Sequence, residues 1–262
     1  MTDKMTSYIK KLLKYKEFLK HGVTSRIIAQ SKSFFLGYFW WLFDPVINLA
    51  IYLFLVRIVF KNNDPQYVFY LAPAILAWSW FSSSVKSCCN IYKNNSNIIK
   101  NFYFPKIILP IQEVIYNTIN FIISLVFLLG IYLLFGIKLD WHLSFVIIGI
   151  LIQFLFTLGV CIFVSHVNVY VRDSEKFVNY GITIWFYLSP VLYSLQSIPE
   201  KFKLLFNLNP FTTIISIYRD ALIFNHTPGI KRIIILLVCS IILIMIGTKI
   251  ISKYEGDYAK RV

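Results

Sequence analysis

The sequence predicts an all-α polytopic membrane protein with about six transmembrane helices. Of the 262 residues, 58% are hydrophobic and 15% are charged, whereas soluble domains average about 45–50% apolar and about 25% charged residues. The apolar residues gather in long runs, and about 20 helical residues cross a hydrocarbon core of about 30 Å. The expected spans cover residues 36–60, 67–89, 107–135, 143–170, 177–195 and 230–251.

The charges at the two ends of the chain indicate its orientation. The first span follows a segment rich in lysine, and segments rich in lysine and arginine stay in the cytoplasm. The C-terminus carries Lys253, Lys260 and Arg261, so both termini are expected inside. We therefore divide the chain into a cytoplasmic N-terminal segment (1–35), a single transmembrane domain (36–252) and a cytoplasmic tail (253–262).

The N-terminal segment has the pattern of an amphipathic interface helix. Apolar residues recur every three or four positions between about Thr6 and Gln30, with lysines between them. A helix with an apolar face and a cationic face lies along the membrane surface instead of crossing it. Gly22 is expected to break or bend this helix. Membrane anchoring and contact with a cytoplasmic partner are its two compatible roles.

The loop from Asn90 to Lys106 is expected in the cytoplasm, because it carries three lysines and no acidic residue. Its N-x-I-I-K core favours a short helix. Pro105 suits the start of the next element, because a first-turn position loses no hydrogen bond to proline.

The third span contains a polar face made of Glu113, Asn117 and Asn120, which lie four and three residues apart. A carboxylate within a span is costly and is expected to face a partner or water. The alternative is that Glu113 lies only at the cytoplasmic interface, since the span begins nearby.

The segment after the fifth span, residues 197–224, is too polar and too broken by Pro199 and Pro210 to be one span, yet it is apolar for a loop. Two short helices at or dipping into the outer leaflet would satisfy its backbone, provided that protein or water covers the break. Asn209 is expected to be the N-cap of a helix that starts at Pro210.

The sequence shows no catalytic or metal-binding motif. The four histidines are scattered, and no nucleophile elbow or G-x-x-x-x-G-K-[ST] phosphate loop is present. We therefore expect no enzymatic site and no cofactor in this chain, so another polypeptide must handle any nucleotide. The net charge of +14 indicates contact with membrane lipid and no nucleic acid, because the basic residues lie in loops between apolar runs.

Several motifs resemble the permease subunits of ABC transporters that export bacterial surface polysaccharides, such as O-antigen, capsule-type glycans and wall teichoic acid. The resemblance covers nearly the full length. It is carried by LGYFWWLFDP (36–45), with Asp44 where asparagine is more usual, by IIKNFYFPKIILP (98–110), by VNVYVRDSEKF (167–177), and most specifically by the I-P-x-K-F, N-P-F and Y-R-D-A-L series within 189–222.

The resemblance implies a multi-pass homodimer in the bacterial cytoplasmic (inner) membrane. Each dimer would pair with two copies of a separate ABC ATP-binding subunit, which binds the ATP and magnesium. The cargo would be a lipid-linked polysaccharide carried on undecaprenyl diphosphate. The N-terminal helix would clasp the ATPase, residues 94–106 would form the cytoplasmic coupling helix, and residues 197–224 would form re-entrant outer gate helices.

These roles give candidate residues. Those expected to couple to the ATPase are Asn97, Ile98, Lys100, Phe104, Pro105 and Lys106. Replacing Phe104 or Lys106 is predicted to uncouple ATP hydrolysis from export without preventing assembly. Outer-gate candidates are Pro199, Asn209, Pro210, Tyr218, Arg219 and Asp220. Arg219 and Asp220 are expected to pair with each other or with gate neighbours, because an unpaired charge there is expensive.

A glycan path needs aromatic faces that stack on sugar rings and amides or hydroxyls that bond to their oxygens. Candidates for this path are Trp41, Tyr52, Glu113, Tyr116, Asn117, Trp185 and Tyr187. The carrier diphosphate favours cations near the inner entrance, for which the candidates are Arg26, Lys32 and Arg172. The alternatives are a membrane glycosyl- or acyltransferase and an ion-coupled flippase, both acting on lipid-linked sugars.

Overall fold

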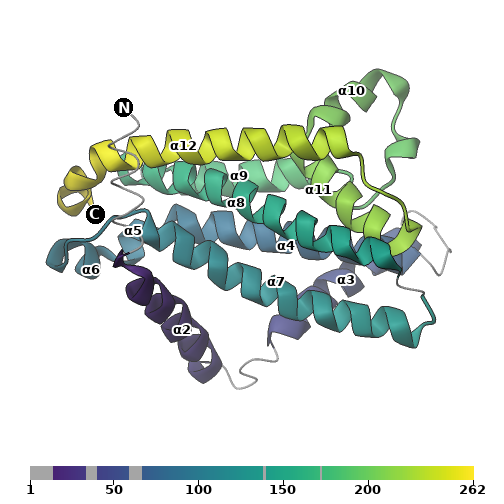
Figure 1. Cartoon of the computed structure of the whole chain (residues 1–262), viewed down its shortest axis with the longest axis horizontal. Helices are drawn as coiled ribbons and strands as arrows, with labels where there is room; N and C mark the ends of the chain where they lie inside the picture. Colours follow the sequence, from purple (N-terminus) through teal and green to yellow (C-terminus); the bar gives the residue numbers. More distant parts are fainter. Residues whose placement is uncertain (1–13, 34–39, 59–66, 138–139, 172) are drawn as a thin grey trace.

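The computed structural model describes residues 14–33, 40–58, 67–137, 140–171 and 173–262, and every regular element in those ranges is a helix. Four of the helices in these ranges are long and apolar enough to cross a membrane. They are α4 (Tyr67–Cys89), α7 (Ile108–Leu134), α8 (Ser144–Tyr170), preceded by the short η2 (Trp141–Leu143), and α12 (Ile230–Arg261) (Figure 1). Helices α4, α7 and α8 coincide with the second, third and fourth predicted spans to within one residue at each end.

Helix α8 forms the centre of the bundle and packs against α12, α4 and α7. Two glycines bring α8 and α12 close together. A Cβ atom at Gly159 would lie 2.9 Å from Leu243 Cβ, and one at Gly247 would lie 2.5 Å from Ile162 Cγ2. Small residues at such crossings are typical of helices that associate within a membrane, where packing replaces the hydrophobic effect.

The fifth predicted span is wrong in its extent. Helix α9 (Ser174–Tyr187) has 14 residues, which at 1.5 Å per residue is about 21 Å and too short to cross the bilayer alone. The chain turns from Leu188 onward because Pro190 has no N–H to donate and disfavours helical backbone at the residue before it. The first predicted span contains α3 (Trp40–Ile58), whose flanking positions 36–39 and 59–60 lie outside the described residues.

The loop between α4 and α7, called the cytoplasmic loop after its predicted side of the membrane, forms two short helices where one was predicted, α5 (Ile91–Asn94) and α6 (Ser96–Asn101). Helix α12 continues past the predicted sixth span (230–251) to Arg261, so the predicted tail at 253–262 is mostly helical. Tyr258 is fully buried in this extension, with its ring centroid 4.9 Å from that of Tyr92 in α5. The apolar contact explains why the helix continues past the apolar run.

At the opposite end of the bundle, the segment after α9 forms η3 (Leu195–Ser197), α10 (Glu200–Leu208), α11 (Pro210–Arg219) and η4 (Asp220–Phe224) (Figure 1). The predicted cap is confirmed. Asn209 Oδ1 accepts from the Phe211 N–H at 2.9 Å, and Pro210 occupies the first helical position. The two prolines therefore start two short helices instead of one span.

Helix α2 (Lys16–Ser33) runs straight through Gly22, so the expected break is absent. Instead, the glycine allows α2 to approach α7 closely. A Cβ atom at Gly22 would lie 2.1 Å from Nε2 of Gln112, which donates to the Phe18 carbonyl at 2.9 Å. The N-terminal part of the amphipathic pattern, residues 1–13, lies outside the described residues.

Candidate functional site

A groove of about 320 Å³ lies between α3, α4 and α9. Aromatic and hydroxyl side chains dominate its walls. Tyr52, Trp78, Phe186 and Tyr187 provide rings, Ser79, Ser82, Ser83 and Thr183 provide hydroxyls, and Asn48, Ile75, Lys86 and Ile182 complete the lining.

The sequence of α4 explains this groove. Positions 79, 82, 83 and 86 share one helix face, because residues three and four apart lie above one another. The opposite face carries Trp80, Phe81 and Val85, which are buried in the core. Helix α4 is therefore apolar toward the bundle and hydrophilic toward the groove, which is the arrangement needed beside an aqueous path through a membrane.

The aromatic wall of the groove is continuous. The ring of Phe186 lies 5.3 Å from that of Tyr52, 5.5 Å from that of Trp78 and 5.2 Å from that of Tyr187, measured between centroids. Aromatic faces beside hydroxyl donors can hold flat, partly apolar, hydroxyl-rich molecules such as sugars.

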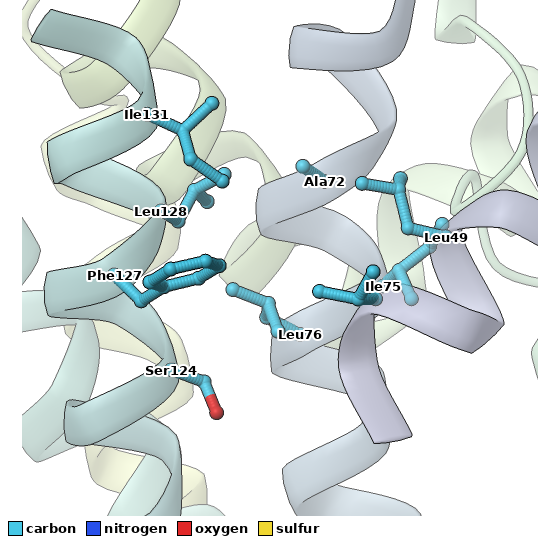
Figure 2. A pocket seen from close by; sticks show the side chains of 9 residues that line it. Leu49, Ala72, Ile75, Leu76, Ser124, Phe127, Leu128 and Ile131 are labelled. Atoms are coloured by element: carbon cyan, nitrogen blue, oxygen red, sulfur yellow. The ribbon is translucent and has the colours of Figure 1, made fainter. Parts of the chain in front are cut away.

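A second pocket, between α3, α4 and α7, is different in kind (Figure 2). It is lined mainly by Leu49, Ile75, Leu76, Phe127 and Leu128, and its volume is about 40 Å³. That is about one eighth of the volume of the groove. This pocket is a packing gap between apolar helices and cannot hold a sugar.

The cytoplasmic loop is tied to the end of α12 through Lys106. Its Nζ donates to the carbonyls of Ile99 at 3.3 Å and Phe102 at 3.1 Å, and its backbone N–H donates to Glu255 Oε2 at 3.1 Å. Burial lowers the pKa of the Lys106 ammonium, and the Glu255 carboxylate opposes that shift. The ammonium closes the C-terminal end of α6, where free carbonyls and the helix dipole favour a cation.

Helix α2 is attached to the same loop. The Tyr15 hydroxyl donates to the Tyr103 carbonyl at 3.1 Å, and the Phe18 ring lies 5.1 Å from that of Phe104. Phe102 and Tyr103 point outward, with 66% and 86% of their surface exposed. The loop thus holds two aromatic side chains in the solvent while its own backbone is fixed from both sides.

An ion pair between a partly exposed arginine and a buried glutamate joins α2 to α7. The Arg26 guanidinium pairs with the Glu113 carboxylate, whose side chain is fully buried, and lies 5.0 Å from the centroid of the Tyr116 ring. Asn117 Nδ2 donates to Glu113 Oε1 at 3.0 Å. Glu113 of the predicted polar face therefore has a charged partner in α2. Whether this carboxylate lies within the membrane or at its cytoplasmic interface stays a prediction.

Residues 195–224, called the outer segment after their predicted side of the membrane, are fixed by Arg219, which is 4% exposed. Its guanidinium donates to the carbonyls of Pro190 at 2.7 Å, Val191 at 2.8 Å and Tyr70 at 3.1 Å, and lies 3.6 Å from the centroid of the Tyr70 ring. Arg219 was expected to pair either with Asp220 or with neighbouring groups, and it bonds to neighbouring carbonyls. These bonds link α11 to α4 and to the turn after α9.

Comparison with known protein families matches residues 21–223, well over half of the chain, to the family described as ABC-2 type transporter. This protein belongs to the ABC-2 type transporter family. A 233-residue stretch is 33% identical to "O-antigen export system permease protein RfbA" of Klebsiella pneumoniae, covering 87% of this chain and 88% of that protein. The protein of the same name from Myxococcus xanthus is 26% identical over 260 residues, which is 98% of this chain and 100% of that protein.

Within this ABC-2 transporter, two of the predicted path residues, Tyr52 and Tyr187, meet in the groove. Trp185 does not line it. Its indole N–H donates to Asn209 Oδ1 at 3.0 Å, beside the outer segment. Glu113, Tyr116 and Asn117 also lie elsewhere, around Arg26, and the Trp41 side chain lies outside the described residues.

The ATPase-coupling candidates separate into two groups. Asn97 and Lys100 are exposed and Ile98 is half-buried, whereas Phe104, Pro105 and Lys106 are buried. Replacing Phe104 or Lys106 would therefore disturb the permease itself, which makes the predicted uncoupling without loss of assembly a poor test. The exposed Phe102 and Tyr103 were missed, although they lie within the motif quoted for residues 98–110, because sequence spacing does not show which of three consecutive aromatic positions points outward.

Among the gate candidates, Pro199 and Asn209 cap α10 and α11, Pro210 begins α11, and Tyr218 is fully buried. Asp220 does not pair with Arg219 through its side chain in the described contacts. Its backbone carbonyl accepts from the His226 N–H at 3.0 Å. These residues shape the outer segment and hold it against the bundle.

Of the cations predicted to bind the carrier diphosphate, Arg26 forms an ion pair with Glu113. The Lys32 side chain and Arg172 lie outside the described residues. Sequence reasoning missed the cation that does line the groove, Lys86. The sequence pattern that could have identified Lys86 is its spacing from Ser82 and Ser83. These residues lie four and three positions before it on one face of α4, and the opposite face is apolar.

Proposed function

We propose that this chain is the transmembrane permease subunit of an ABC exporter that moves a lipid-linked polysaccharide across the cytoplasmic membrane. The carrier would be undecaprenyl diphosphate, and the cargo an O-antigen, a capsule-type glycan or a teichoic acid. The observation that carries this proposal is the hydroxyl- and aromatic-lined groove on α4, in a chain 33% identical to a protein named as an O-antigen export permease.

The working unit in this proposal is a homodimer with two ATP-binding subunits, which bind the ATP and magnesium. A second copy facing the groove would close it into a channel. Helix α3 would be the first of six spans, and α9 would form the fifth together with the residues that follow it. Both termini would lie in the cytoplasm. Figure 1 supports a C-terminus on the same side of the membrane as the coupling segment, because α5, α6 and the C-terminus share one end of the bundle and α10 lies toward the other.

The two ends of the bundle would have different tasks. At the cytoplasmic end, α2, α6 and the exposed Phe102 and Tyr103 would receive the push of the ATPase. At the outer end, α10 and α11 would form a gate that dips into the outer leaflet. Helix α10 exposes Leu204, Leu205 and Leu208 by 72%, 61% and 72%, and a lipid-facing helix accommodates such apolar exposure.

Purification of the tagged protein from its own host in mild detergent tests this function. We expect a stoichiometric soluble partner with a phosphate-binding loop, and ATP-dependent movement of a lipid-linked glycan after reconstitution of the complex. A clean homo-oligomer without an ATPase, under conditions that preserve other membrane complexes, would contradict the proposal.

The exposed aromatic pair gives a sharper test of coupling. A variant with Phe102→Ser and Tyr103→Ser is expected to keep the fold, because both side chains point into solvent, but to lose at least tenfold in export per ATP hydrolysed. Interface hot spots are often exposed aromatic side chains that become buried in the complex. Lys253→Gln, an exposed site on the same end of the bundle, is the control and should export normally. Unchanged export by the double variant would exclude this surface as the ATPase contact.

A further inference from the structure

The groove between α3, α4 and α9 contains one side chain that a path for neutral sugars does not require. Lys86 lines the groove and is exposed. The described residues that line the groove include no acidic side chain, and the described ion pairs do not involve Lys86. A cation in a membrane helix is expensive unless it faces water and a counter-charge, so its counter-charge has to come from outside these residues.

Other buried or half-buried cations of the bundle are already engaged. Arg26 pairs with Glu113, Lys106 donates to two carbonyls of the cytoplasmic loop, and Arg219 donates to three carbonyls at the outer end. Each of these charges therefore has a structural partner. Lys86 differs from them because its surroundings in the groove are hydroxyls and rings.

The position of Lys86 along α4 indicates where an anion would bind. It lies in the last turn of α4, which leads directly into the cytoplasmic helices α5 and α6. Ser82 and Ser83 lie four and three residues before it, on the same helix face. The Lys86 ammonium and the Ser83 hydroxyl offer several hydrogen-bond donors to one anion at the inner end of the groove. The Ser82 hydroxyl donates to the Ser79 carbonyl at 3.2 Å, and it would rotate away from that carbonyl to donate to the anion.

We propose that Lys86, with Ser82 and Ser83, binds the diphosphate of the polyprenyl carrier at the inner end of the groove. This site rests on the proposed function and specifies which part of the substrate it recognises. Lysine suits a diphosphate because its compact ammonium acts as a point charge with three rotatable donors. The sugars would then extend outward along the wall formed by Tyr52, Trp78 and Phe186.

A diphosphate site and simple membrane anchoring make different predictions for Lys86. A lysine near a helix end can extend its ammonium to the interface and stabilise the helix orientation without binding any ligand. Lys249 provides a matched control, because it is an exposed lysine near the cytoplasmic end of α12 and does not line the groove. A general effect of losing a cytoplasmic lysine would be the same at both positions.

The test uses the intact permease with its ATPase partner in lipid nanodiscs. The dissociation constants of undecaprenyl diphosphate and of undecaprenol are measured by native mass spectrometry for the wild type, Lys86→Gln, Lys86→Arg and Lys249→Gln. We expect Lys86→Gln to weaken diphosphate binding about tenfold, which equals about 1.4 kcal/mol. Lys86→Arg should bind within about threefold of the wild type. Undecaprenol, which lacks the anion, should bind equally to all four proteins.

The proposal is overturned if Lys86→Gln binds undecaprenyl diphosphate like the wild type, or if it loses the alcohol to the same degree. An equal loss in Lys249→Gln would assign the effect to membrane anchoring. Displacement of the lipid by equimolar inorganic diphosphate would assign the site to a free anion. If the wild-type complex exports glycan but lipid binding does not depend on Lys86, the proposed function stands and only this site is excluded. If the wild type does not export glycan, the proposed function itself is contradicted.

Discussion

The Arg219→Gln variant is expected to lose about 3–5 kcal/mol of stability, because each buried carbonyl left without a donor costs about 1–3 kcal/mol. The guanidinium is 4% exposed and donates to the carbonyls of Pro190, Val191 and Tyr70. Glutamine has one short amide group and no charge, so most of these carbonyls would be left without a donor in a buried site. Thermal unfolding of the purified protein in detergent measures the loss.

Two further variants show whether the geometry or only the charge of Arg219 matters. Arg219→Lys keeps the charge but lacks the planar fork that reaches several carbonyls at once, so its stability should lie between those of the glutamine variant and the wild type. Lys203→Gln removes an exposed cation of the same outer segment, where the pair with Glu200 is worth about 0–1 kcal/mol. Equal unfolding temperatures for Arg219→Gln and Lys203→Gln would show that Arg219 does not hold the segment.

The position of Arg219 also predicts which step of transport the Arg219→Gln variant loses. Helices α10 and α11 lie at the opposite end of the bundle from α5 and α6 (Figure 1). A weakened outer segment should therefore leave binding of the ATPase partner intact while export falls. Loss of partner binding together with export would indicate that the whole bundle had unfolded.

The parts of the fold that could be predicted from the sequence are those set by local hydropathy and turn chemistry. The bounds of α4, α7 and α8, and the start of α11 at Pro210, follow from apolar run lengths and from a proline after an N-cap asparagine. The length of α9 could not be predicted in the same way. Apolar residues continue past Tyr187, and a hydropathy count does not register the turn that Pro190 imposes.

The candidate site was less predictable, because its residues come together only in three dimensions. Arg26 and Glu113 are 87 positions apart in the sequence, and Arg26 had been expected to meet a diphosphate. Similarly, Trp78 and Phe186 share a wall of the groove although they belong to α4 and α9. Residue type indicated that aromatic and cationic groups were available, but only helix packing determined which of them face the groove.

The second large effect is expected at the pair between α2 and α7. Arg26→Gln should destabilise the protein by about 2 kcal/mol, because it leaves the buried Glu113 carboxylate without a counter-charge and with only the neutral side chains of Asn117 and Ser87 as described hydrogen-bond partners. This is less than the roughly 3–5 kcal/mol of a fully buried pair, since 42% of the Arg26 side chain is exposed. Lys20→Gln, on an exposed position of the same helix, is the control and should change stability by less than about 0.5 kcal/mol.

A double-mutant cycle separates the pair from the rest of the contact between the two helices. Glu113→Gln alone should cost less than Arg26→Gln, because the arginine left behind reaches water and the Tyr116 ring. The double variant should then be about as stable as Glu113→Gln alone, since no unpaired carboxylate remains in the bundle. If the two single losses simply add, the ion pair contributes nothing to stability. Helix α2 is then held by the hydrogen bond from Gln112 to the Phe18 carbonyl and by the close packing of Gln112 against Gly22. If the cycle shows coupling, the helix that would contact the ATPase is fixed electrostatically to a membrane-spanning helix, and a push on α2 would reach α7 directly.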